Sequence, residues 1–339
     1  MQKQRQSNIE LLRIIAITMV LMLHFNLHGF TPDVLSGSIP FSWCSLRGNL
    51  IESFCICAVN VFVLISGYFS IKLSVRSVLN LYIRCFIIGL ITYVAYILIS
   101  GESISLYAIA GRSMAFTHNH WWFVVSYLGL MAISPILNAG CETLDKRTYQ
   151  YVLLLFSAAM IYLGWWKYLE ITNGGYSLIH FIYLYVIARY VKLHVRETMI
   201  FHYRWLWILL FICICMIIAT LQFVTTRSMY SYDNPLVILA ALTLLLFFIT
   251  IPFKNQFINR VAASVFAAYL IQESPYLGKM WLYPLAADVI ANGSCGGGAM
   301  LFVVFTVATL VSSVIIDQIF VMPVITLINS YLFRISCKK

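Results

Sequence analysis

The sequence predicts an all-α polytopic membrane protein with about ten transmembrane helices and both termini in the cytoplasm. Hydrophobic residues make up 62% of the 339 residues, charged residues only 10%, and the mean hydropathy is +0.89. A soluble domain carries about 25% charged residues, so lipid is the expected solvent for most of this chain. Apolar runs of roughly 17 to 25 residues, the length that crosses a bilayer, recur from end to end. We therefore expect residues 1–339 to form a single integral-membrane domain.

The apolar runs are separated by short connectors that hold most of the basic residues. The first run follows MQKQRQ, as in a signal peptide, but it is too long and no small-residue cleavage site follows, so we expect a retained helix. The ninth run is short for a span and the tenth is long, and Pro323 is expected to kink or end the tenth. The expected spans are 8–29, 50–71, 79–100, 121–139, 149–166, 175–191, 204–224, 235–252, 258–272 and 298–330.

The distribution of basic residues indicates which connectors face the cytoplasm. If the N-terminus lies inside and the spans alternate, fifteen of the 22 Lys and Arg residues fall in inner segments and five in outer loops. The net charge of +10 then reflects membrane topology. Nucleic-acid binders instead gather Lys and Arg on one polar face, so we expect no nucleic-acid partner.

The nine cysteines show no spacing typical of a metal site, and we expect no metal. Cys55, Cys57, Cys213 and Cys215 lie in apolar runs, where free cysteine behaves as a small hydrophobic residue. Cys44 and Cys295 are expected in loops on the same side of the membrane, which leaves a disulfide between them open.

The first span, NIELLRIIAITMVLMLHFNLH, carries polar residues at two depths. Arg13 and His24 are eleven residues apart, a rotation of about 1100°, so they share one helix face and stand ~16.5 Å apart along the axis. Glu10 and His28 lie near the same stripe, at i−3 from Arg13 and i+4 from His24. Ionisable residues inside a span are functional candidates.

Each of these residues also has a structural interpretation. Ser7 and Glu10 match a capping box, which would explain Glu10 without function. Arg13 is close enough to the interface to snorkel, and His24 could be a buried polar residue bonded to a neighbouring helix. Asp317 in the last span is left open between a partner of an arginine for packing and a site residue, which would orient Arg13.

The order of several short motifs resembles the membrane-bound acyltransferase family 3. An arginine and a histidine separated by ten residues, with an acidic residue before them, open the chain in that family, as Arg13 and His24 do here. Three later stretches are similar to the family's second-span, fourth-span and late motifs, namely VFVLISGYFS (61–70), His120-Trp121-Trp122-Phe123 and AAYLIQESP (267–275). The late motif departs from the family pattern because Gln272 stands where histidine is common, and we therefore leave position 272 out of the catalytic set. Ser66-Gly67 within the second-span motif is expected to allow close helix packing.

The resemblance implies an integral-membrane O-acetyltransferase. Its co-substrate would be acetyl-CoA from the cytosol, and its acceptor would be a hydroxyl of a cell-surface or lipid-linked saccharide. The expected location is the inner (cytoplasmic) membrane, with several passes through it, and a homo-oligomer stays open.

The residues then take the following expected roles. His24 is the general base, since its ordinary pKa lies near neutrality; a covalent acyl-imidazole is left open. Arg13 belongs to the catalytic set and also holds CoA phosphates, with Glu10 to orient it. The other expected CoA-binding residues are Arg76 and Arg84. The expected acceptor-binding residues are His28, His118, His120, Trp121 and Trp122, although interfacial tryptophans also occur as membrane-belt residues.

Two other classes of protein compete with this interpretation. A transporter or flippase of a polar or lipid-linked substrate would use polar residues at two depths to line an alternating-access route. That class predicts internal repeats, and the sequence shows none. A scaffold protein gives no reason for an aligned Arg13 and His24.

Overall fold

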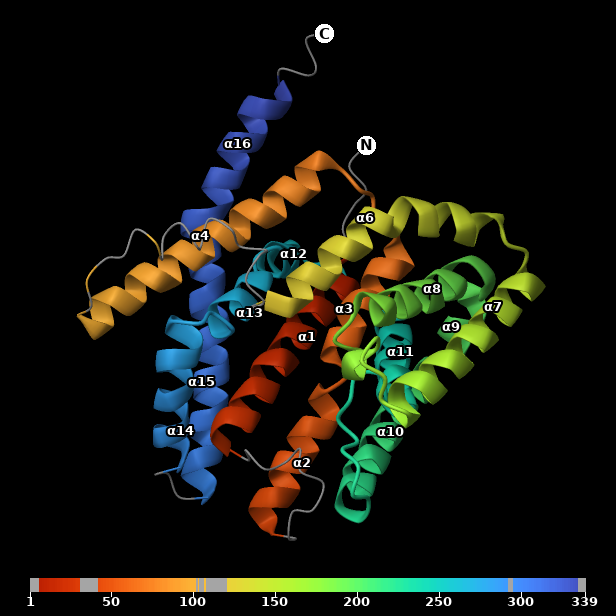
Figure 1. Ribbon diagram of the computed structural model, residues 1–339, viewed down its shortest axis with the longest axis horizontal. Helices are drawn as coiled ribbons and strands as arrows, with labels where there is room; N and C mark the ends of the chain where they lie inside the picture. The colour runs from red at the N-terminus through yellow and green to blue at the C-terminus, as the bar shows by residue number, and fades with distance from the viewer. Residues whose placement is uncertain are drawn as a thin grey trace.

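A computed structural model of the chain describes residues 6–30, 42–101, 103, 107, 121–291 and 295–334. All regular structure in these ranges is helical, which confirms the all-α fold. The helices form a bundle in which the longest elements run in several directions (Figure 1). Their bounds are α1 (Ser7–Phe25), η1 (Asn26–Phe30), α2 (Trp43–Cys55), α3 (Ala58–Phe69), α4 (Val75–Ser100), α6 (Trp122–Thr143), α7 (Lys146–Ala159), η4 (Met160–Trp166), η5 (Asn173–Gly175), α8 (Leu178–His194), α9 (Glu197–His202), α10 (Arg204–Val224), α11 (Pro235–Ile249), α12 (Gln256–Ala262), α13 (Phe266–Gln272), η6 (Leu277–Leu282), α14 (Tyr283–Ala291), α15 (Cys295–Ile316), η7 (Asp317–Val321) and α16 (Met322–Arg334).

Seven helical segments within the described residues are long and apolar enough to cross a membrane. They are Ser7–His28, Ser45–Phe69, Val75–Ser100, Trp122–Thr143, Lys146–Trp166, Arg204–Val224 and Gly298–Leu332. Each coincides with one of the expected spans, so the chain is a multi-span membrane protein. The other three expected spans do not form helices as long as these seven: 175–191 corresponds to α8, which has 17 residues and begins three residues later, 235–252 corresponds to α11, which has 15, and 258–272 is divided between α12 and α13, with seven residues each. The count of ten and the cytoplasmic position of both termini stay predictions.

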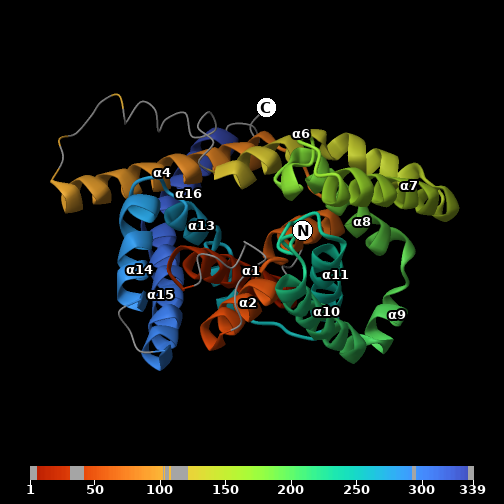
Figure 2. The same ribbon diagram turned by 60° about the horizontal axis from the view of Figure 1, so that its bottom comes forward.

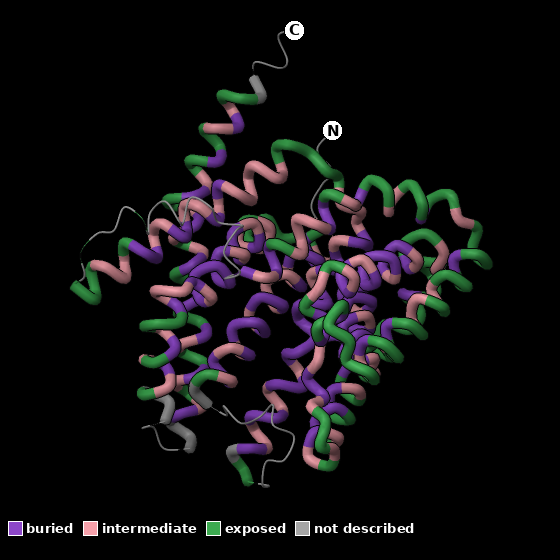
Figure 3. Tube along the Cα trace, viewed as in Figure 1, coloured by how far each residue is buried: buried purple, intermediate pink, exposed green. Residues whose placement is uncertain are grey.

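The first helix lies at the centre of the bundle. It contacts α2, α3, α11, α12, α13, α14 and α15. Figure 2 shows α1 between the α14–α15 pair and the α10–α11 pair, with α4, α6 and α7 along one side of the molecule. Figure 3 shows buried residues gathered on α1 and α3, whereas α7 and α16 are mostly exposed. Because apolar side chains on α7 and α16 would face lipid, exposure there agrees with a membrane protein, and the buried α1 is where polar groups need protein partners.

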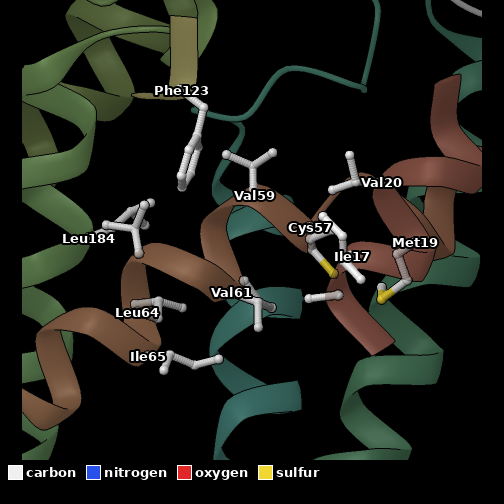
Figure 4. Packing of buried hydrophobic residues seen from close by; sticks show 14 of the residues in the cluster. Ile17, Met19, Val20, Cys57, Val59, Val61, Leu64, Ile65, Phe123 and Leu184 are labelled. Carbon is white, nitrogen blue, oxygen red and sulfur yellow. The ribbon is translucent and has the colours of Figure 1, made fainter. Parts of the chain in front are cut away.

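The core around α1 is built from small and branched side chains. Ile17 and Val20 of α1 lie beside Cys57 and Val59, at the joint between α2 and α3 (Figure 4). On its other side, α3 packs against α6 and α8, which contribute Phe123 and Leu184 in the same view. The second span is therefore held between the first helix and the α6–α8 layer.

Gly67 of α3 lies close against the backbone of α8. A Cβ at this position would lie 2.6 Å from the backbone oxygen of Tyr185 and 2.9 Å from Cβ of Ala188. The structure thus confirms that the Ser66-Gly67 pair allows close helix packing.

We expect the Gly67→Ala substitution to lower the free energy of unfolding by about 1–3 kcal/mol, because backbone atoms of α8 would have to move. The measurement is the thermal unfolding temperature of the detergent-solubilised protein. Gly140→Ala in α6 is the matched control, since nothing lies within 4 Å of a Cβ there. The control should be neutral or slightly stabilising, because alanine favours a helix over glycine. Equal unfolding temperatures for the two variants would contradict the packing argument.

The last long span changes its hydrogen-bond pattern before Pro323. Regular α-helix ends at Ile316, the π-helical turn η7 follows, and α16 begins at Met322. Pro323 therefore sits in the first turn of α16, where a missing N–H costs little, and the helical path continues beyond it. The π-helical turn begins at Asp317, a buried acid.

Candidate functional site

The polar residues of α1 are bonded within the protein. The N-cap of α1 is Gln6, with no side-chain cap, and Ser7 lies inside the helix. Ser7 instead exchanges hydrogen bonds with the backbone of Asn255, at 2.9 Å from its nitrogen and 3.3 Å from its oxygen. Glu10 is buried and accepts hydrogen bonds from Nη1 of Arg13, at 3.1 and 3.3 Å. The capping-box interpretation of Ser7 and Glu10 is therefore wrong, and Glu10 pairs with Arg13 instead.

Arg13 lines a cavity of about 280 Å³. Arg84 of α4 lies in the same wall, so two guanidinium groups contribute to one cavity. Two hydroxyl groups add polarity, those of Ser66 and Tyr127, which lie 3.2 Å apart. The volume is close to the lower limit for pockets that hold small organic ligands, roughly 300 Å³.

His24 lines a second, narrower cavity of about 30 Å³. Phe62, Phe123 and Phe266 line both cavities, so the two spaces are neighbours and these three rings stand between them. The structure thus places Arg13 and His24, eleven residues apart on α1, on adjacent protein-lined spaces.

His24 is held by the last residue of α13 and by the residue that follows it. Its Nδ1 lies 3.0 Å from Oε1 of Gln272 and 3.5 Å from Oε1 of Glu273. Glu273 also receives a short hydrogen bond from the hydroxyl of Tyr283 and lies 3.4 Å from Nζ of Lys279. Neither Gln272 nor Glu273 is among the site residues that the sequence predicts. The available signal was an acid directly after an apolar run, which marks a functional candidate in a membrane protein.

Electrostatics keep Glu273 ionised. Burial alone would raise its pKa, but the neighbouring His24, the hydroxyl of Tyr283 and the ammonium of Lys279 together bring the pKa of Glu273 below its ordinary value. A carboxylate that stays charged through the neutral range therefore lies beside the imidazole.

Arg84 and Asp317 form an ion pair across α4 and η7. Nε of Arg84 lies 3.0 Å from Oδ1 of Asp317, and Nη2 donates to Oδ2 at 3.3 Å. Asp317 is fully buried. Asp317 is thus the partner of an arginine, and that arginine also lines the Arg13 cavity. Among the described acids, Glu10 forms the ion pair with Arg13. Arg76, the second residue of α4, is exposed and is not among the residues that line the two cavities.

Of the two tryptophans expected to bind the acceptor, one lines the His24 cavity and the other does not. Trp122 lines the His24 cavity, with its ring 4.5 Å from Tyr176 and 5.9 Å from Tyr232, centroid to centroid. Trp121 is buried and donates from Nε1 to the oxygen of Leu270 at 3.3 Å, so it packs against α13 and does not line this cavity.

His28 stacks on Tyr283, with ring centroids 4.1 Å apart. His118 and His120 lie outside the described residues, as do the side chains of Cys44 and Cys295. Tyr176 and Tyr232 are aromatic neighbours that the sequence analysis missed, because loops far apart in sequence bring them to Trp122.

Within the described ranges, no group of three or more His, Cys, Asp or Glu residues could hold a metal ion.

A third cavity, of about 830 Å³, lies at the start of α1 beside residues 251–256. It shares no lining residue with the Arg13 cavity or the His24 cavity.

In the comparison with protein families, residues 6–318 match the acyltransferase domain of acyltransferase family 3. Comparisons with curated proteins and with solved structures found no match. The matched region contains every site residue described above, from Glu10 to Asp317. The family implies acyltransferase activity and does not favour a transporter or flippase. The chain belongs to acyltransferase family 3 and is a membrane-spanning member of it.

Proposed function

We propose that this protein transfers an acetyl group from cytosolic acetyl-CoA to a hydroxyl of a cell-surface or lipid-linked saccharide. The observation that carries the proposal is that Arg13 and His24, on one central helix, line two neighbouring cavities that share the rings of Phe62, Phe123 and Phe266. A guanidinium suits the phosphates of the donor, and an imidazole suits the reacting end. The proposed location is the inner membrane, which the chain crosses several times.

Arg13 is the proposed contact for CoA phosphates. A guanidinium has five N–H donors in a planar fork, and Glu10 engages only the Nη1 group. Arg84 adds positive charge to the same cavity, but its guanidinium is already paired with Asp317. We therefore assign Arg13 the larger share of the binding to CoA phosphates. Arg76 would contact CoA outside this cavity. The cavity of about 280 Å³ would take the slender pantetheine arm, whose thioester end would reach past the three rings towards His24, while the nucleotide stays towards the cytoplasm.

His24 is the proposed general base. It takes the proton from the acceptor hydroxyl while that oxygen attacks the carbonyl carbon of the thioester. The carbon–sulfur bond breaks as the new carbon–oxygen ester bond forms. CoA leaves as a thiolate, which takes up the proton from the imidazolium. A general base of this kind contributes about 100- to 10,000-fold to a rate.

Aromatic rings at the His24 cavity support a saccharide as acceptor. Trp122 and Tyr232 line the cavity, and Tyr176 packs against both rings. The C–H faces of a sugar ring pack on aromatic faces, and the hydroxyls of the sugar remain free for hydrogen bonds. His28 lies one helical turn beyond His24 and would add a polar contact. His118 and His120 retain the acceptor-binding role that the sequence suggests.

The test of this proposal is a coupled assay on purified protein in liposomes. We expect release of CoA thiol from acetyl-CoA only when a glycan acceptor is present, with one labelled acetyl group appearing on the glycan for each thiol released. Movement of the glycan across the liposome membrane without thiol release would contradict the proposal and favour a transporter.

The Arg13→Ala substitution is expected to weaken acetyl-CoA binding by about 10- to 100-fold, because hydrogen bonds to a charged group contribute roughly 1.5–3 kcal/mol. The measurement is isothermal titration of the detergent-solubilised protein with acetyl-CoA at low salt. Arg147→Ala at the exposed start of α7 is the control and should leave the affinity unchanged. An unchanged affinity in Arg13→Ala would rule out this role of Arg13.

A further inference from the structure

The side-chain amide of Gln272 is fixed in one orientation. Gln272 is fully buried, and its Nε2 donates to the backbone oxygen of Leu21 at 3.2 Å. A carbonyl oxygen can only accept, so the NH₂ group must face Leu21 and Oε1 must face His24. Oε1 lies 3.0 Å from Nδ1 of His24. Because Oε1 is also only an acceptor, the proton of this hydrogen bond belongs to Nδ1.

A second acceptor faces the same ring nitrogen. Oε1 of Glu273 lies 3.5 Å from Nδ1 of His24. The titratable groups around His24 are Glu273 from the turn, Lys279 from η6, Tyr283 from α14 and His28 from η1. Only Glu273 offers negative charge, and Tyr283 and Lys279 hold it in place from the other side. Two acceptors on one edge of the ring both favour Nδ1–H, and no described residue forms a hydrogen bond to Nε2 of His24.

The turn that presents these two acceptors is tightly closed. The hydroxyl of Ser274 donates to the oxygen of Ile271 at 2.7 Å and accepts from the nitrogen of Gly278 at 2.9 Å. A Cβ at Gly278 would lie 1.9 Å from the oxygen of Gln272, so only glycine fits there. The backbone at Gln272 and Glu273 is therefore fixed by packing, as a positioning element requires.

We infer that Gln272 and Glu273 are positioning residues, which hold neutral His24 with its proton on Nδ1 and its lone pair on Nε2. The inference rests on the proposed function, in which His24 is the base. With the proton on the other nitrogen, the ring would present N–H to the acceptor hydroxyl and could not take its proton. When His24 accepts that proton, the carboxylate of Glu273 stabilises the imidazolium, as an acidic residue does in other base-and-orienter pairs.

The first test reads the tautomer directly. Protein labelled with ¹⁵N-histidine, in detergent at a pH where His24 is neutral, should give ring signals for Nδ1–H and an unprotonated Nε2. The signals are assigned to His24 by their loss in His24→Ala. Wild-type protein with the proton on Nε2 would overturn the inference, and this measurement needs no activity.

Two substitutions at position 272 separate positioning from packing. Gln272→Glu and Gln272→Leu both lose the bond to Leu21, but only the glutamate keeps an acceptor for Nδ1. We expect Gln272→Glu to keep Nδ1–H, and Gln272→Leu to move the proton to Nε2 in a measurable fraction of molecules. The kcat of Gln272→Leu should fall by about 100-fold, with the KM for acetyl-CoA unchanged. Equal tautomer populations in the two variants would overturn the role of Gln272.

Glu273→Gln tests the carboxylate, and Glu170→Gln at an exposed site is the control. We expect the first to lower kcat without a change in the KM for acetyl-CoA, and the second to change neither. A Glu273→Gln variant with wild-type kcat would overturn the role of Glu273. If His24→Ala kept full activity while the wild type showed Nδ1–H, the positioning of the ring would stand and the proposed role of His24 as base would fail.

Discussion

Replacing His24 by alanine is expected to lower kcat for acetyl transfer by about 100- to 10,000-fold, the usual contribution of a general base. The side chain is partly exposed to a cavity and makes one hydrogen bond, so the protein should stay folded. Binding of acetyl-CoA should be preserved, because Arg13 stands ~16.5 Å away along the helix. The measurement is the initial rate of labelled acetyl transfer to the glycan under saturating donor.

His202→Ala is the matched control for this experiment. His202 ends α9 on an exposed surface, away from both cavities. The same loss of an imidazole there should leave kcat within about twofold of wild type, the change expected of surface substitutions with stability effects under roughly 0.5 kcal/mol. A His24→Ala variant that retains a tenth or more of the wild-type kcat would remove His24 from the chemical step.

The second large effect is expected at the Arg84–Asp317 ion pair. Asp317 is fully buried, and Arg84 is its charged partner at 3.0 Å. The Arg84→Ala substitution would leave a buried carboxylate without that partner, and it should lower the free energy of unfolding by about 3–5 kcal/mol. The measurement is the unfolding temperature in detergent, compared with that of Arg147→Ala at an exposed site.

The double variant Arg84→Met/Asp317→Leu distinguishes structure from donor binding. Apolar side chains of similar size should restore most of the stability, because no charge is then left buried. If acetyl-CoA affinity returns together with stability, Arg84 serves the fold. If stability returns and the affinity stays low, Arg84 binds the donor as well. A double variant as unstable as Arg84→Ala would contradict the ion-pair argument.

The sequence predicted the first span and its polar face because both depend on local periodicity. The apolar run predicts a span over 8–29, and the structure has a helical segment, Ser7–His28, that is long and apolar enough to cross a membrane. The depth of Arg13 and His24 follows from the rise of a helix alone. The partners of these residues depend on which helices meet α1, and no local pattern specifies that.

The expected span 258–272 shows the limit of apolar length as a guide. Its sequence contains neither proline nor glycine, so nothing local predicts the break at Ala263–Val265. In the structure, Ser264 in this break accepts a hydrogen bond from Gln318 of the π-helical turn at 2.5 Å. A tertiary contact between two irregular segments therefore decides the geometry, and average hydropathy cannot detect it.

Gln272 shows a second limit, that of comparison with a motif. The departure from histidine at this position suggested that it lacked a role. The structure instead shows the amide bonded to both His24 and Leu21. A hydrogen-bonding function can pass from one side chain to another when both offer an acceptor at the same place.

The three phenyl rings between the two cavities have a consequence for the cell's energy supply. Phe62, Phe123 and Phe266 line both spaces, and the narrower space has only about 30 Å³. A narrow constriction formed by apolar rings blocks hydrated ions, since an ion would have to shed its water there. An uncharged thioester arm meets no such barrier. An enzyme built this way could pass acyl groups through the bilayer without letting protons leak across it.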